Sequence, residues 1–136
     1  MELGYTTTLP TTFDDAVART REALTEQGFG VLTEIDVTAT LKKKLDEELE
    51  NYLILGACNP QLAHRALGVD RQLGLLLPCN VVVRDDVENP GTVIVEAMNP
   101  DIMVAVTDEP DLRAVAADAS TKLKAAIANL TAAVAS

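Results

Sequence analysis

The apolar runs of this 136-residue chain are short, and this limits what it can fold into. The longest, residues 53–58 and 73–79, have the length of β-strands and fall well short of the roughly 18 apolar residues that suggest a membrane span. A run of three valines, Val81 to Val83, is typical of a strand buried on both faces. We therefore expect a domain built around a β-sheet, with no membrane partner.

Hydrophobic periodicity and capping residues divide the chain into strands and helices. Residues 29–37 alternate with period two, so we expect their odd-numbered side chains to form one buried face. Thr12, with Asp15 three residues later, resembles a helix-capping box, and Asn59-Pro60 places a cap and a proline at the start of another helix. The expected strands are 2–9, 29–37, 52–58, 75–85 and 92–98; the expected helices are 13–27, 38–50, 60–68, 100–105 and the segment from residue 110 onward.

This order of elements predicts an α+β fold, a two-layer domain. Strands joined by short helices and by one tight turn, Asn89-Pro90-Gly91, favour a mostly antiparallel sheet. Two long helices would cover one face of the sheet in a β-α-β(4)-α arrangement, with short inserted helices between strands. The length fits a single domain, residues 1–136.

The second face of the predicted sheet is less polar than a solvated face. We expect it to carry Leu32, Val82, Ile94 and Met98, or the residues that alternate with them. Either the short inserted helices or a second copy of the chain would cover such a face. A homodimer is therefore one expectation.

Charge and composition exclude several classes of partner. The net charge is −10, from 21 acidic and 11 basic residues, and such a field repels nucleic acid and anionic membranes. Aromatic residues make up only 3% of the chain, too few for a platform that stacks bases or sugars. The N-terminus has neither the basic start nor the apolar run of a signal peptide, so we expect a cytoplasmic protein with reduced thiols.

The best candidate site is the pair of cysteines, Cys58 and Cys79, each followed by an asparagine. Cys58 ends one predicted strand and Cys79 begins the next, so an antiparallel pairing would bring the two thiols together. Cys58 also precedes the predicted helix start at Asn59-Pro60, where unpaired N–H groups favour a thiolate. Asn59 and Asn80 could bond a ligand carbonyl. The pair could bind a small ligand or a soft metal, or exchange thiols.

Plainer interpretations of the same residues stay open. Both cysteines are also what a well-packed core uses as small hydrophobes, Asn59 is a helix cap, and Asn80 is a polar strand residue. His64 lies on the polar face of its predicted helix, and the Cys and His spacing lacks the C-x-x-C pattern of a zinc site. We therefore expect His64 to face solvent.

The basic cluster of Lys42, Lys43 and Lys44 is the second candidate, for an anion. It lies near the start of the predicted helix 38–50, and helix starts bind phosphate or carboxylate. The alternative is a solvated face paired with the acids at 46–48.

Four blocks of the sequence carry a family resemblance: Gly28-Phe29-Gly30-Val31, Thr40 to Leu45, Tyr52 to Pro60 with Gly-Ala-Cys-Asn-Pro at its end, and Leu77-Pro78-Cys79-Asn80-Val81. They resemble the domain of unknown function 302 family, over nearly the whole chain. The resemblance implies a β-α-β(4)-α domain similar to the fold of the TATA-binding protein, paired as a homodimer. It implies no activity, and fold alone brings no DNA binding with it.

The sequence thus leaves three functions open. One is a small dimeric domain that uses the Cys58/Cys79 locus for a ligand, a soft metal or thiol exchange. Another is an association domain whose apolar sheet face only forms the homodimer. The third is an enzyme whose catalytic residues lie around the same cysteines in a constellation that no motif identifies. No Gly-rich phosphate loop or catalytic triad is present, so no reaction type and no cofactor is indicated.

Overall fold

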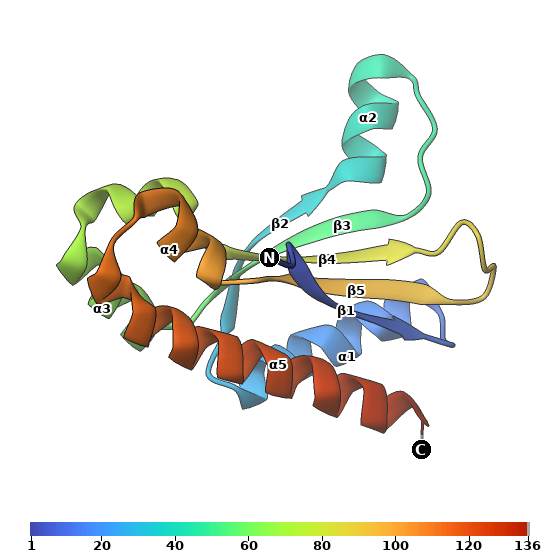
Figure 1. Ribbon diagram of the computed structural model, residues 1–136. Helices are drawn as coiled ribbons and strands as arrows, with labels where there is room; N and C mark the ends of the chain where they lie inside the picture. The colour runs from blue at the N-terminus through green and yellow to red at the C-terminus, as the bar shows by residue number, and fades with distance from the viewer. Residues whose placement is uncertain (136) are drawn as a thin grey trace.

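The structure, a computed structural model, describes residues 1–135, and within them five strands form one antiparallel sheet in the order β1-β5-β4-β3-β2 (Figure 1). The strands are β1 (Gly4–Leu9), β2 (Gly30–Asp36), β3 (Tyr52–Cys58), β4 (Cys79–Asp85) and β5 (Val93–Met98). The helices are α1 (Phe13–Glu26), α2 (Val37–Leu45), α3 (Pro60–Val69), α4 (Asp101–Thr107) and α5 (Arg113–Ala135), with 3₁₀ turns η1 (Arg71–Leu76) and η2 (Pro110–Leu112). The predicted α+β class and antiparallel sheet are confirmed.

The local capping signals act as the sequence predicts. The Thr12 hydroxyl accepts a hydrogen bond from the backbone N–H of Asp15 at 3.2 Å, and α1 begins at the next residue. The Asn59 side chain accepts from the N–H of Leu62 at 3.2 Å, with Pro60 in the first position of α3. Among the helices of residues 1–135, none combines the length and apolar character needed to span a bilayer.

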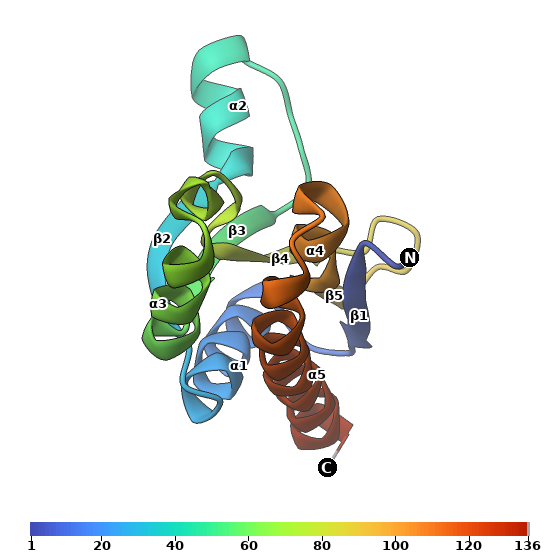
Figure 2. The same ribbon diagram turned by 60° about the vertical axis from the view of Figure 1, so that its left-hand side comes forward.

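The main core lies between the sheet and the two helices α1 and α5, which cover the same face (Figures 1 and 2). Alternate residues of the central strands point into it and are essentially inaccessible to solvent, as period-two alternation requires. They are Leu53, Leu55 and Ala57 on β3, Val81 and Val83 on β4, and Val93, Val95 and Ala97 on β5. The prediction that two long helices cover one face is confirmed.

A second, smaller core lies beyond one end of the sheet. Here α3, α4 and the two 3₁₀ turns pack against the first half of α5 (Figure 1). Leu112 and Val115 belong to this second core, whereas Leu123 and Leu130 of the same chain segment belong to the main one. Helix α5 therefore joins the two cores. The predicted strand 75–85 begins later, at Cys79, because Leu75 and Leu76 belong to η1. Leu73 and Leu76 of this turn pack in the second core, whereas Leu75 is 83% exposed.

The prediction for residues 29–37 is wrong about which side chains are buried. A β-bulge between Val31 and Thr33 shifts the register of β2 against β3. Beyond it, Thr33 and Ile35 point away from the helices, and Ile35 is 51% exposed. An extra residue in a strand reverses the face of every later side chain, so a strict alternation in the sequence does not give one buried face here.

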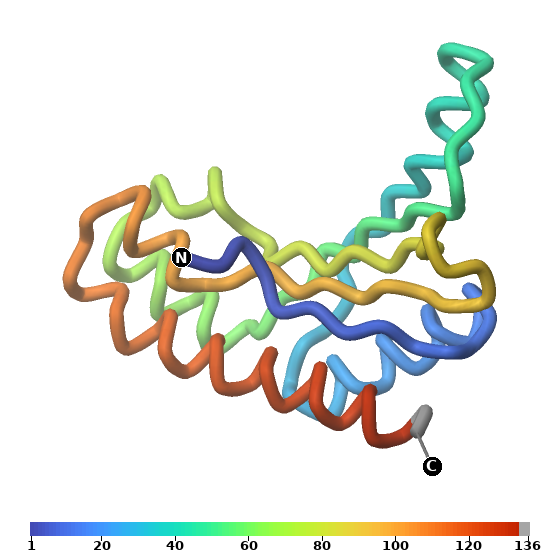
Figure 3. The backbone as a smooth tube through the Cα atoms, turned by 45° about the vertical axis from the view of Figure 1, so that its right-hand side comes forward, coloured from blue at the N-terminus to red at the C-terminus, as the bar shows by residue number. Residues whose placement is uncertain are grey.

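Helix α2 stands away from the rest of the molecule (Figures 1 and 3). None of its nine described residues is buried. The predicted helix 38–50 is wrong in length, because Asp46 adopts a left-handed conformation, with φ of 54°, and ends the helix at Leu45. Residues 37–51, which include α2 and which we call the α2 excursion, are closed at their base by Thr38. Its hydroxyl accepts from the N–H of Tyr52 at 2.8 Å and donates to the carbonyl of Glu50 at 2.6 Å.

The other face of the sheet, which we call the open face, lies opposite the face that α1 and α5 cover, and α2 projects away from it at the β2–β3 edge (Figure 2). One row runs across it from β2 to β1: Ile35, Ile54, Val82, Glu96 and Thr6. As predicted, Val82, Ile94 and Met98 lie on this face. Leu32 lies in the bulge and is 69% exposed. The alternative that inserted helices cover the face is wrong, since α3 and α4 pack on α5.

Candidate functional site

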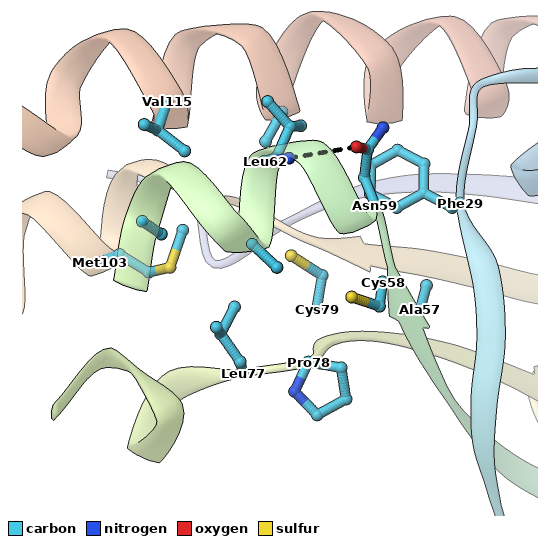
Figure 4. A pocket seen from close by; sticks show the side chains of 13 residues that line it. Phe29, Ala57, Cys58, Asn59, Leu62, Leu77, Pro78, Cys79, Met103 and Val115 are labelled. Atoms are coloured by element: carbon cyan, nitrogen blue, oxygen red, sulfur yellow. Dashed lines mark hydrogen bonds between the residues drawn. The ribbon is translucent and has the colours of Figure 1, made fainter. Parts of the chain in front are cut away.

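Strand pairing brings the two cysteines together, as the sequence analysis expects. Strands β3 and β4 are antiparallel, and Ala57 lies opposite Cys79, so Cys58 is one residue beyond the direct partner. Although neighbours on a strand normally point to opposite faces, Cys58 is the last residue of β3, and both side chains line the same cavity next to α3 (Figure 4). Both cysteines, each within the described residues, are free thiols.

The cavity lies where the main core meets the second core. Its volume is about 20 Å³, which is room for about one water-sized particle. It is lined by Phe29, Ala57, Cys58, Asn59, Leu62, Ala63, Ala66, Leu77, Pro78, Cys79, Met103, Val115 and Ala119. Every lining side chain except those of the two cysteines, Asn59 and Met103 is hydrocarbon. The cysteine thiols are therefore the main reactive groups of the cavity.

The two thiols differ in their exposure to solvent. Cys79 is only 7% exposed, whereas Cys58 is half-buried. Burial, and secondly the neighbouring Cys58 thiol, raise the pKa of Cys79 from 9.0 to about 11, because both disfavour the thiolate. Cys79 is therefore protonated at neutral pH, and Cys58 is the thiol that a reagent from solvent meets first.

The two asparagines that follow the cysteines have different positions. Asn59 lines the cavity, but its side-chain oxygen already accepts from the N–H of Leu62, so it acts as a cap (Figure 4). Asn80 is exposed on the open face and lines another cavity there, of about 220 Å³, with Tyr52 and Val82. The structure therefore brings Asn59 to the cysteines and leaves Asn80 on the opposite side of the sheet.

The other candidates lie outside the cavity. His64 is exposed on α3, as expected. Lys42, Lys43 and Lys44 lie in the last turn of α2, so the argument that they sit near a helix start is wrong. Lys42 instead pairs with Asp46 and Glu48, each at 2.7 Å. Lysines in a last turn favour the helix through its dipole.

Sequence reasoning missed the residues that complete the cavity. Phe29, just before β2, and Met103 on α4 reach it from distant parts of the chain. No local pattern marks them, because both positions depend on tertiary packing: Phe29 packs in the main core, and Met103 is brought by the packing of α4 against α5. Within residues 1–135, no group of three His, Cys, Asp or Glu side chains could hold a metal ion, which argues against a zinc site of ordinary composition.

Comparison with known proteins identifies the family. The family model described as "Domain of unknown function DUF302" matches residues 5–130. The crystal structure of an uncharacterised conserved DUF302 protein from Bacillus stearothermophilus is similar, with a TM-score of 0.86 and 31% sequence identity over 96% of this chain and 99% of that one. No curated protein matches the chain. This chain belongs to the DUF302 family, a family of domains of unknown function.

Proposed function

We propose that this protein binds a thiophilic metal ion, foremost Cu(I), between Cys58 and Cys79. The observation that carries the proposal is that two free thiols line one cavity of about 20 Å³ that is otherwise almost entirely apolar. Thiolates are the ligands that select Cu(I), and a cytoplasmic location would keep both thiols reduced. The volume suits a bare ion and leaves no room for an organic ligand.

Thiol exchange at the same pair is the competing chemistry, and the protonation of Cys79 argues against it. A thiol with a pKa of about 11 is a poor nucleophile at neutral pH, because little thiolate is present. It is also a poor leaving group when its disulfide is attacked. A metal ion is different, since it displaces the proton outright on coordination.

The charge of such a centre is compatible with its surroundings. Cu(I) bound by two thiolates releases two protons and carries a net charge of −1. Cys58 directly precedes Asn59, the cap of the ten-residue helix α3, and the start of a helix favours negative charge. The half-buried Cys58 would receive the ion from solvent, and the buried Cys79 would then close the site.

The test is a competition titration. The reduced protein is titrated anaerobically with Cu(I) in the presence of a chromogenic Cu(I) chelator. We expect one Cu(I) per chain, with release of two protons per ion. Cys58→Ser and Cys79→Ser should each lower the affinity by more than the roughly 10–100-fold that loss of an outer-shell partner costs a metal site. His64→Ala, at the exposed histidine of α3, is the matched control and should bind as the wild type does.

A thiol assay after removal of the metal separates binding from oxidation, and two free thiols per chain are expected. A wild-type protein that binds no more Cu(I) than a Cys58→Ser/Cys79→Ser double variant contradicts the proposal. Recovery of a disulfide in place of two thiols would support thiol exchange instead.

The open face favours a second candidate function, association of two copies. On this face Ile35 is 51% exposed, and its row continues through the half-buried Ile54 and Val82. A contiguous apolar surface of this kind is typical of an interface. The partner would be another copy of the chain, packed sheet to sheet. Measurement of molar mass in solution tests this candidate, and a wild-type mass of one chain contradicts it.

A further inference from the structure

The open face holds a cavity of its own, which we call the open-face cavity, with a volume of about 220 Å³. Its apolar lining includes the half-buried side chains of Val82 and Met98 and the 81% exposed side chain of Leu3. Gly4, which lies opposite Met98, adds no side chain to this lining. Pockets that take drug-sized ligands measure about 300–1,000 Å³, so the open-face cavity fits a smaller molecule.

Three polar side chains, those of Tyr52, Asn80 and Glu96, line the same cavity. The side-chain amide of Asn80 is exposed, and within residues 1–135 no protein group bonds to it. The half-buried side chain of Tyr52 adds an aromatic ring to the lining. An apolar cavity with a few polar groups is the usual composition of a site for a small molecule.

The carboxylate of Glu96 is held by partners on both neighbouring strands. Its Oε1 accepts from the Nε of Arg84 on β4 at 2.9 Å, and its Oε2 accepts from the hydroxyl of Thr6 on β1 at 3.5 Å. The first distance is that of a good hydrogen bond, whereas the second is longer than such bonds usually are. The Glu96 side chain is 35% exposed. Its Oε2 therefore keeps the capacity to accept from a better donor, which a ligand in the cavity would supply.

We infer that the open-face cavity binds a small primary amine with an apolar body, whose ammonium group donates to the Glu96 carboxylate and to the side-chain oxygen of Asn80. The apolar body lies against Val82 and Met98. An ammonium group makes charge-assisted hydrogen bonds, and it is also attracted to the face of an aromatic ring such as that of Tyr52.

The charges around the cavity favour a cation over an anion. Among the described residues, no lysine or arginine lines the cavity, and the chain carries a net charge of −10. The inference is independent of the proposed metal site, because the two cysteines lie on the other side of the sheet from Asn80.

The probe for this site is phenethylamine, whose phenyl ring and two-carbon chain form the apolar body. It is titrated into isotopically labelled protein and followed by NMR. We expect saturable shifts of the Asn80 side-chain amide signals and of the backbone amides of Val82 and Met98. Phenethyl alcohol has the same body without the charge, so it should bind more weakly by about fivefold or more.

Two variants separate the site from general attraction to an acidic protein. Glu96→Gln should lower the phenethylamine affinity by about fivefold or more, because it removes the charged acceptor. Glu34→Gln is the matched control, since Glu34 is also a strand carboxylate paired with an arginine, Arg21, but does not line the cavity. Glu34→Gln should bind as the wild type does. Thermal unfolding of both variants verifies that they fold.

Three outcomes would overturn the inference. One is the absence of saturable binding to the wild type, whether the protein is one chain or two in solution. Another is equal affinity for phenethylamine and phenethyl alcohol, which would remove the role of the ammonium group. The third is an equal loss of affinity in Glu96→Gln and Glu34→Gln, which would show attraction to net charge alone. None of these results bears on the two-cysteine site, which the Cu(I) titration tests.

Discussion

Gly56 on β3 lies opposite Thr33 on β2, and the Thr33 hydroxyl occupies the space that a Cβ atom at position 56 would need. The Cγ atom of Pro78 would lie 2.8 Å from the same Cβ. Glycine is thus required by close packing at the edge of the cysteine site. This gives a physical reason for the glycine in the Gly-Ala-Cys-Asn-Pro block.

We predict that Gly56→Ala destabilises the protein, by about 1–3 kcal/mol, as overpacking of a well-filled site does. Gly30→Ala, on β2, is the matched control, because among the described residues no atom lies within 4 Å of a Cβ built there. Urea unfolding followed by circular dichroism measures both. Equal stability of the two variants would show that the contacts around position 56 relax without cost.

The buried thiol of Cys79 predicts a loss of stability at alkaline pH. Its pKa is about 11 in the folded protein and 9.0 ordinarily, so between these values the unfolded chain has lost a proton that the folded chain keeps. The free energy of unfolding is therefore undiminished below pH 9 and falls as the pH rises to 11, by about 2–3 kcal/mol in total.

Unfolding of the wild type, Cys79→Ala and Cys58→Ala at several pH values between 8 and about 11 checks this alkaline loss. Cys79→Ala should lose less stability over the range than the wild type, whereas Cys58→Ala should keep most of the wild-type loss. Parallel curves for the wild type and Cys79→Ala would contradict the assignment.

The two asparagines should differ in their effect on stability. Asn59→Ala removes the cap of α3 and is expected to cost about 1 kcal/mol. Asn80→Ala, on the exposed strand position, should change the stability by less than about 0.5 kcal/mol. Asn59→Asp retains a capping oxygen and should recover most of the loss. Equal effects at positions 59 and 80 in thermal unfolding would contradict the cap.

The proposed homodimer predicts that a charge on the open face separates the two copies. Ile94 lies opposite Arg84, so Ile94→Lys places two positive charges side by side on the open face. Light scattering should give the mass of two chains for the wild type and of one chain for the variant. Val106→Lys is the control, because Val106 is 65% exposed on α4, away from this face. An unchanged mass for Ile94→Lys would contradict the interface.

Much of the fold could be predicted because its signals are local. The caps at Thr12 and Asn59 depend on side chains within three residues of the bonds they make, and both are confirmed. The approach of the two cysteines could also be predicted, to within one residue, from the order of two neighbouring strands.

What escaped prediction depends on tertiary structure. The bulge after Val31 reverses the later part of β2, although the sequence alternates without interruption. The left-handed turn at Asp46 ends α2 inside a run of good helix formers. Met103 reaches the cavity only because α4 packs against α5, and a short apolar helix carries no mark of the partner it will meet.

The hydroxyl of Thr38 fastens both ends of the α2 excursion to each other, independently of what lies between them. The intervening residues can therefore vary in length or sequence at small entropic cost, since the penalty for closing a loop grows only slowly with its size. The α2 excursion is thus a natural insertion point. A reporter or an added recognition element inserted there would leave the sheet and the cavity lined by Cys58 and Cys79 undisturbed.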